Sequence, residues 1–213
     1  GDVNGDGIDD LVVNARNADP GGLDNAGETY VVFGPIGPGT VDLTTAADVT
    51  IRGGDAEEIS GSGLAVGDLN ADGVNDLVIG SMAAMASGRI GAGKVFVLEG
   101  PLQAGTFGLH DVASIVVEGE SAVDRLGASV AIADVNGDGR QDLVMGASFA
   151  DPNGINDAGI TYVMFGNIFD RESTPPESSL PKVLIGVGAF IVVIGGGVGI
   201  RWLRRVRRGS GPA

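Results

Sequence analysis

The chain has 213 residues, of which 28 are acidic and 13 are Lys or Arg, giving a formal net charge of −15 at pH 7. All the acidic residues precede Lys182, together with only seven of the basic ones. This balance argues against nucleic-acid binding by the main part of the chain, because phosphate recognition needs a basic face. It favours cation binding, or an extracellular or saline environment. The absence of Cys, the single His and the 38 Gly residues limit catalytic chemistry and are typical of turn-rich β-structure.

One motif occurs three times, as DVNGDGIDDLVV at 2–13, DLNADGVNDLVI at 68–79 and DVNGDGRQDLVM at 134–145. The step between copies is therefore 66 residues, from 2 to 68 and from 68 to 134. Two further markers keep this step, because TYVVFG at 29–34 matches KVFVLEG at 94–100 and TYVMFG at 161–166, and GLAV at 63–66 matches GASV at 127–130. A constant period in three markers predicts a repeat architecture.

Each repeat predicts four short strands, which in the middle repeat cover 63–66, 76–80, 94–98 and 114–117. The segment 49–52 is the fourth strand of the preceding repeat, and 35–40 and 83–93 are long loops. Four strands at a fixed step are typical of a propeller blade, so the fold class predicted for 1–169 is all-β, a β-propeller.

The ring is expected to be incomplete in this chain. The first blade has no first strand, and the last has no fourth strand after Gly166. Since a propeller needs about four to eight blades, we expect upstream sequence to complete the ring, with the N-terminus of the complete protein supplying that fourth strand.

The three acidic motifs predict calcium sites, one in each repeat. Calcium takes about six to eight oxygen ligands, and a tight loop turns alternate side chains toward its centre, while Gly at the sixth position permits the turn. Clustered carboxylates repel one another unless a divalent cation neutralises them. The expected side-chain ligands are Asp2, Asn4, Asp6 and Asp10, then Asp68, Asn70, Asp72 and Asp76, then Asp134, Asn136, Asp138 and Asp142, and the expected carbonyl ligands are those of Ile8, Val74 and Arg140.

Two alternatives remain for these motifs. One is a plain Asp/Asn/Gly turn without metal, which a threefold repetition disfavours. The other is an EF-hand, which needs a carboxylate at position 12 followed by a helix. That position is Val13, Ile79 or Met145, each within an apolar run that predicts a strand.

The string GDLNADGVNDLVIG at 67–80 resembles the FG-GAP repeat of integrin α-subunits and of many bacterial surface proteins, and FGP at 33–35 and FG at 165–166 resemble its Phe-Gly half. The resemblance covers about 1–167. It implies a seven-bladed ring, of which this chain holds about three blades, with calcium in hairpin loops on the face opposite most ligand contacts. The chain departs from the pattern at EG, 99–100, in place of Phe-Gly, and at NAR, 14–16, in place of Gly-Ala-Pro.

After the repeats, 170–181 predicts a Pro/Ser-rich linker. The residues 183–200 carry no charge and, as a helix, would be about 27 Å long, so 182–200 is expected to form a transmembrane helix. The sequence RWLRRVRR at 201–208 places 201–213 in the cytoplasm and the propeller outside the cell. A buried core segment is the bland alternative, and resemblance to PEP-CTERM sorting signals leaves cleavage of this region open.

No catalytic constellation is recognised, because His110 has only Asp111 beside it and no nucleophile motif accompanies it. We therefore expect no enzyme, but a calcium-binding adhesion or interaction module at the cell surface with an unidentified protein or glycan ligand. The alternatives are the non-catalytic propeller portion of a larger extracellular hydrolase or lyase, and a structural surface-layer component.

Overall fold

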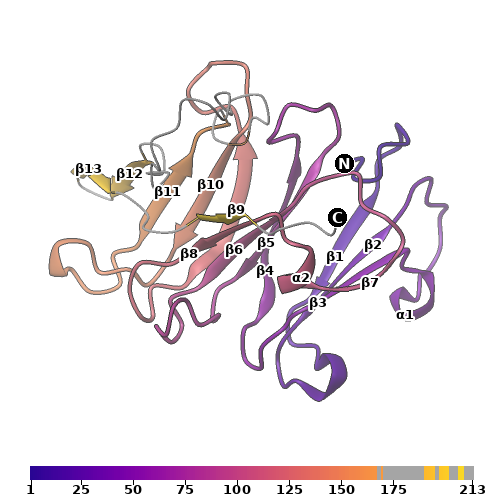
Figure 1. Cartoon of the computed structure of the whole chain (residues 1–213), viewed down its shortest axis with the longest axis horizontal. Helices are drawn as coiled ribbons and strands as arrows, with labels where there is room; N and C mark the ends of the chain where they lie inside the picture. The colour runs from indigo at the N-terminus through magenta and orange to yellow at the C-terminus, as the bar shows by residue number, and fades with distance from the viewer. Residues whose placement is uncertain (167–168, 170–189, 195–196, 202–205, 209–213) are drawn as a thin grey trace, which may run out of the picture.

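The computed structural model describes residues 1–166, 169, 190–194, 197–201 and 206–208, which form three twisted sheets side by side (Figure 1). The middle sheet corresponds to one complete repeat. Its strands are antiparallel neighbours in the order of the sequence, with a short C-terminal strand added at the outer edge. They are β4 (Ser60–Gly67), β5 (Asp76–Ser81), β6 (Lys94–Leu98), β8 (Ile115–Glu118) and β14 (Val206–Arg208). The four strands predicted for this repeat are confirmed, to within a few residues at their ends.

The other two sheets repeat this arrangement on either side. The first contains β1 (Leu11–Ala15), β2 (Glu28–Val32), β3 (Val49–Arg52) and β7 (Gly105–Gly108). The third contains β9 (Leu126–Ala133), β10 (Asp142–Ala147), β11 (Ile160–Met164), β12 (Phe190–Ile194) and β13 (Gly197–Arg201).

Strand β7 was not predicted from the sequence, and it does not belong to the sheet of its own repeat. It lies between β6 and β8 in the chain but pairs in parallel with β3 of the first sheet, with Val49 opposite Gly105 and Arg52 opposite Gly108. The segment that follows β6 therefore crosses to the neighbouring blade and forms its outer edge.

Alternating apolar residues join the sheets. In β5, Leu77 and Ile79 belong to the core shared with the first sheet, whereas Val78 belongs to the core shared with the third. Such a strand is buried on both faces, which explains its unbroken apolar sequence. Strand β4 packs against β9 of the next blade. Here a Cβ on Gly80 would overlap the main-chain oxygen of Gly127, so the close approach of the two blades requires glycine.

Four helical turns lie in the connections: η1 (Pro20–Gly22), α1 (Leu43–Ala46), α2 (Leu109–Val112) and η2 (Pro152–Gly154). Asp42 caps α1 by accepting a hydrogen bond from the main-chain N–H of Thr44. Helix α2 lies in the connection that leads from β7 back to β8.

The C-terminal region departs from the predicted transmembrane helix. Within the expected span 182–200, the described residues are 190–194 and 197–200, and they lie in the antiparallel strands β12 and β13. The sequence FIVVI of β12 is rich in β-branched residues, which favour strands over helices. The remaining residues of that span, the linker 170–181 and most of 201–213 lie outside the described residues.

None of the helices that the structure describes is long and apolar enough to cross a membrane.

The expected closure of the ring is also not seen. The outer edge of β11, where a strand from elsewhere in the complete protein was predicted, pairs with β12, with Thr161 opposite Val193. Among the described residues the three sheets form an open arc of blades and no sheet is closed.

Candidate metal sites in the acidic loops

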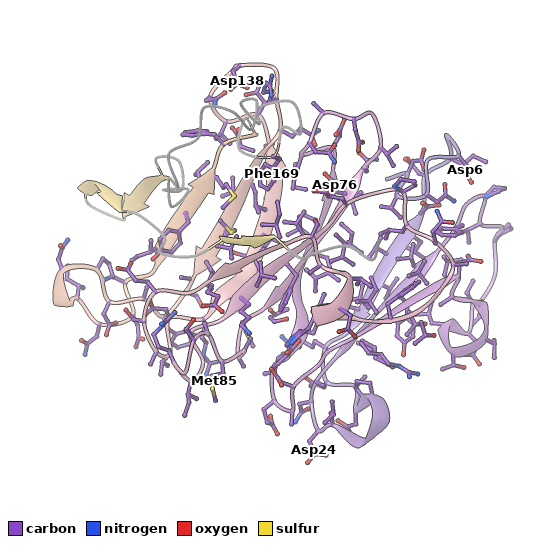
Figure 2. All side chains as sticks on the ribbon, viewed as in Figure 1. Asp6, Asp24, Asp76, Met85, Asp138 and Phe169 are labelled. Atoms are coloured by element: carbon purple, nitrogen blue, oxygen red, sulfur yellow. The ribbon has the colours of Figure 1, made fainter. Side chains whose placement is uncertain are left out.

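The three acidic motifs form hairpin bends at the same end of the three sheets. The second and third motifs connect β4 to β5 and β9 to β10, and the first leads into β1. Figure 2 shows Asp6, Asp76 and Asp138 at this end of the molecule, with Asp24 and Met85 at the opposite end. The repeat period therefore brings the predicted metal ligands onto a single face.

In each loop the first acidic residue organises the turn. Oδ1 of Asp134 accepts hydrogen bonds from the main-chain N–H groups of Gly137 and Asp138, at 2.7 and 3.2 Å, and Oδ2 accepts one from Gly139 at 2.9 Å. The third and fifth positions follow, since Oδ1 of Asn136 accepts from Asp138 and Oδ1 of Asp138 accepts from Arg140. The side-chain oxygens thus gather around the inside of the bend.

The other two loops reproduce this pattern. Asp2 accepts from the N–H groups of Gly5, Asp6 and Gly7, and Asp68 accepts from those of Asp72 and Gly73. The residues at the seventh position, whose carbonyls were predicted to be ligands, lie alike in all three loops. Their N–H groups each donate to the fifth-position Asp, and they are Ile8, Val74 and Arg140.

Glycine has a physical role at the sixth position. Gly7, Gly73 and Gly139 have φ values of 87°, 90° and 85°, in the left-handed region that favours glycine. The fourth position is left-handed as well, and there the second loop has Ala71, at a φ of 56°, instead of glycine.

The ninth-position aspartate differs from the others because it is buried. Asp76 and Asp142 are fully buried and Asp10 is 8% exposed. In the second loop Oδ2 of Asp76 accepts from the N–H of Leu69 and Oδ1 from the N–H of Gly100, both at 3.0 Å. This carboxylate therefore holds the start of its loop against the end of β6.

The equivalent bonds occur in the other repeats. Asp10 accepts from Val3 and Gly34, and Asp142 accepts from Val135 and Gly166. A Cβ on Gly34, Gly100 or Gly166 would lie 2.5 Å from a main-chain oxygen at the end of the acidic motif. Glycine is therefore the essential half of the Phe-Gly marker, and Glu99 can replace Phe without altering the loop.

The electrostatics of the loops are consistent with a divalent cation. The main-chain N–H of Gly139 lowers the pKa of Asp134, against the opposing effect of desolvation, so this exposed carboxylate is held ionised. Burial raises the pKa of Asp76 to about 6, although two main-chain N–H groups act in the opposite direction, and the charges of Asp72 and Glu99 raise it further. A divalent cation beside such a cluster would favour the ionised form of every member.

The donor set also fits calcium. Each bend gathers three carboxylates and one amide, all oxygen donors, around a turn with the glycine that such loops require. The structure brings all the side chains that were predicted as ligands into their respective bends and separates the ninth-position aspartates from the rest by burial.

Sequence reasoning missed a second group of potential ligands, at the opposite end of the sheets. Asp55 and Glu58, in the connection from β3 to β4, meet His110 of α2, and their donor atoms all lie within 4.8 Å of one another. The hydrogen bond to Glu58 raises the pKa of His110, against the effect of desolvation. No local pattern could have revealed this group, because 52 residues separate Glu58 from His110.

Comparison with known proteins agrees with the repeat structure. The sequence model of the FG-GAP repeat matches residues 1–32, 60–98 and 126–164, one segment per blade. The chain is 32% identical over 183 residues to phosphatidylinositol-glycan-specific phospholipase D of Homo sapiens, covering 84% of this chain and 21% of that protein. It is 30% identical over 218 residues to integrin alpha pat-2 of Caenorhabditis briggsae, covering 94% of this chain and 16% of that protein. The chain thus spans about a fifth, or less, of the length of these relatives.

Proposed function

Because the chain belongs to the FG-GAP repeat family, we propose that it is a calcium-stabilised propeller segment of a cell-surface protein and that it serves in adhesion or in the binding of a protein or glycan. The family match covers one segment in each of the three blades. The strongly acidic composition of the chain before Lys182 supports an extracellular, cation-rich setting.

One observation carries the calcium part of the proposal. Three bends, 66 residues apart, place the same oxygen donors in the same hydrogen-bonding pattern, down to the acceptor roles of Asp2, Asp68 and Asp134. In the absence of a cation, each bend would hold its carboxylates close together at a cost in electrostatic repulsion. Calcium would remove this repulsion and make the hairpins rigid.

The binding surface is proposed to be the end opposite the calcium loops. There the connections are long, since 82–93 joins β5 to β6 and 148–159 joins β10 to β11. Loops carried by a rigid scaffold are where binding residues usually lie. The division of labour would then be structural at the acidic end and recognition at the other.

The comparisons favour a second candidate function, that of a non-catalytic propeller portion of a larger extracellular hydrolase. Its support is the similarity to phosphatidylinositol-glycan-specific phospholipase D over 84% of this chain but only 21% of that protein. Sequencing the complete gene would discriminate the two. A hydrolase domain outside the repeats favours the second, whereas further repeats alone favour the first.

Attachment to the membrane through the C-terminal region remains a proposal. It is supported by the uncharged stretch 183–200 and by the five Arg residues of 201–208 that follow it. Deletion of 183–208 from the gene in its native host should release the protein into the medium. Continued retention at the membrane would refute this anchor without bearing on calcium binding.

The calcium proposal is tested by thermal unfolding of the chain in EDTA and at increasing calcium concentration. A ligand that binds only the native state stabilises it, by about 2.7 kcal/mol at 100 times Kd for one site, so the midpoint should rise steadily. Substituting Asp68, Asp72 and Asp76 together by Asn should reduce this rise. Asp24→Asn, at the opposite end, is the control. A midpoint unaffected by calcium would refute the proposal.

A further inference from the structure

Two connections meet at the end of the molecule opposite the acidic loops. Asp55 and Glu58 belong to the segment between β3 and β4, and His110 lies in α2, between β7 and β8. Nε2 of His110 lies 2.9 Å from Oε2 of Glu58. A carboxylate oxygen of Asp55 completes a group of three donor atoms that all lie within 4.8 Å of one another.

Two of the three side chains are already held in position by packing. Glu58 is only 1% exposed, and its Oε1 receives the hydroxyl of Ser81 at 3.5 Å. The ring of His110 stacks on Phe96, with 5.2 Å between centroids and 20° between planes. Gly54 lies against the other parts of this ring, since a Cβ there would be 3.1 Å from it. Pre-positioned donors of this kind lower the cost of binding an ion.

The charge balance at this group is unfavourable for a buried carboxylate. Glu58 and Asp55 carry two negative charges, and the basic side chain that also acts on the group is Lys94. A buried carboxylate is costly unless it is paired or coordinates a metal. When His110 is neutral, two carboxylates and an imidazole have the charge and the donor atoms to hold one divalent ion.

We propose that Asp55, Glu58 and His110 form a binding site for a transition-metal ion of the Zn²⁺ class. Imidazole nitrogen suits zinc and its neighbours, whereas calcium takes oxygen donors, so this site would differ in selectivity from the acidic loops. Three protein ligands leave one position of a tetrahedral ion open. Asp55 and His110 are exposed, so this position faces solvent.

The site is not a feature of the repeat. One period later, Ser121 and Asp124 stand where Asp55 and Glu58 stand, and the chain has no second His to complete the group. In that repeat Asp124 accepts a hydrogen bond from the N–H of Ser121 and closes its own turn instead. The zinc site thus arises only where the segment that crosses to the first blade brings His110 to the β3–β4 connection, and it would fasten that segment in place.

The experiment uses the single His of the chain as its reporter. The full chain is first saturated with calcium, so that the acidic loops are occupied, and ZnCl₂ is then added. We expect one Zn²⁺ per chain by calorimetry and a shift of the imidazole ¹⁵N resonances, which belong to His110 alone. Asp55→Asn and His110→Gln should each weaken zinc binding by at least about tenfold. Asp111→Asn, next to the site, should leave it unchanged.

Asp55 is exposed, so Asp55→Asn should fold normally, and an unchanged calcium-dependent melting midpoint verifies this. The proposal fails if the His110 resonances stay in place in excess Zn²⁺, or if Asp55→Asn binds zinc as tightly as the unaltered chain. Either result would identify the contact between Glu58 and His110 as an ion pair only. Neither result would affect the calcium proposal, which concerns other residues.

Discussion

Oδ1 of Asp76 accepts a 3.0 Å hydrogen bond from the main-chain N–H of Gly100, which follows the end of β6, 24 residues further along the chain. The same bond, at 2.9 Å, joins Asp10 to Gly34 and Asp142 to Gly166. The two markers of the repeat, an acidic loop and a later glycine, are therefore the two sides of one contact. Whatever orders the acidic loop also fixes the end of the third strand.

Replacing Gly100 by Ala should destabilise the fold. Its Cβ would lie 2.5 Å from the main-chain oxygen of Asn75 and 2.7 Å from Val74, so the loop would have to move. Overpacking of this kind costs about 1–3 kcal/mol, measurable by urea denaturation. Gly37→Ala is the control, because a Cβ there meets nothing within 4 Å and should change the stability by less than about 0.5 kcal/mol. Equal stabilities for the two variants would contradict the steric argument.

Calcium stoichiometry should follow the number of intact loops. The unaltered chain is expected to bind three ions, and Asp138→Asn, which removes one charge from the third loop, should reduce the number to two at moderate calcium concentration. Asn at this position can still accept the hydrogen bond from the N–H of Arg140, so the turn itself should persist. Equilibrium dialysis with radioactive calcium provides the count. Three tightly bound ions in this variant would argue against Asp138 as a ligand.

Ala71→Gly should stabilise the second loop. Ala71 has a φ of 56°, whereas the equivalent residues Gly5 and Gly137 pay no penalty for their left-handed conformation. Relief of this strain should exceed the added chain entropy and raise the free energy of unfolding by roughly 0.5–1 kcal/mol. In Ala131→Gly, within β9, the same change should lower it. A loss of stability in both variants would show that the strain at Ala71 is negligible.

Stability should fall in alkaline solution because of Tyr30. Its hydroxyl donates a hydrogen bond to Glu28, and this bond raises the pKa of Tyr30 from 10.0 to about 12. The folded state thus holds this proton more tightly than the unfolded state, and the stabilisation is complete below pH 10 and lost between pH 10 and 12. Tyr30→Phe should lose less stability between pH 9 and pH 12 than the unaltered chain, by urea unfolding. Parallel losses in both proteins would exclude this contribution.

Periodicity allowed most of the fold to be predicted. Strands β4, β5, β6 and β8 alternate apolar residues between two cores, and their local pattern repeats, so the sequence was sufficient to place them. Strand β7 was missed because its four residues, GTFG, carry no strand signal and are ordered by pairing with β3, 56 residues earlier from Gly105 to Val49. The expected C-terminal helix rested on hydropathy alone, and hydropathy does not distinguish the β-branched run of β12 from a helix.

The candidate sites show the same limit. The composition of each acidic loop identified its donors, because ligands within ten residues must lie close together. The distinct role of Asp76, buried and doubly hydrogen-bonded, depends on a partner 24 residues away and was not visible. The meeting of Asp55, Glu58 and His110 depends on the path of the crossing segment and was invisible for the same reason.

Strand β7 makes adjacent blades interdependent in a way that a tandem repeat does not require. Because the second repeat supplies the outer edge of the first sheet, a duplication or deletion of one 66-residue unit would strip a neighbour of an edge strand or leave a spare one. The first two repeats must accordingly be inherited as a pair, and a protease that cuts between β6 and β8 would loosen two blades with a single cleavage.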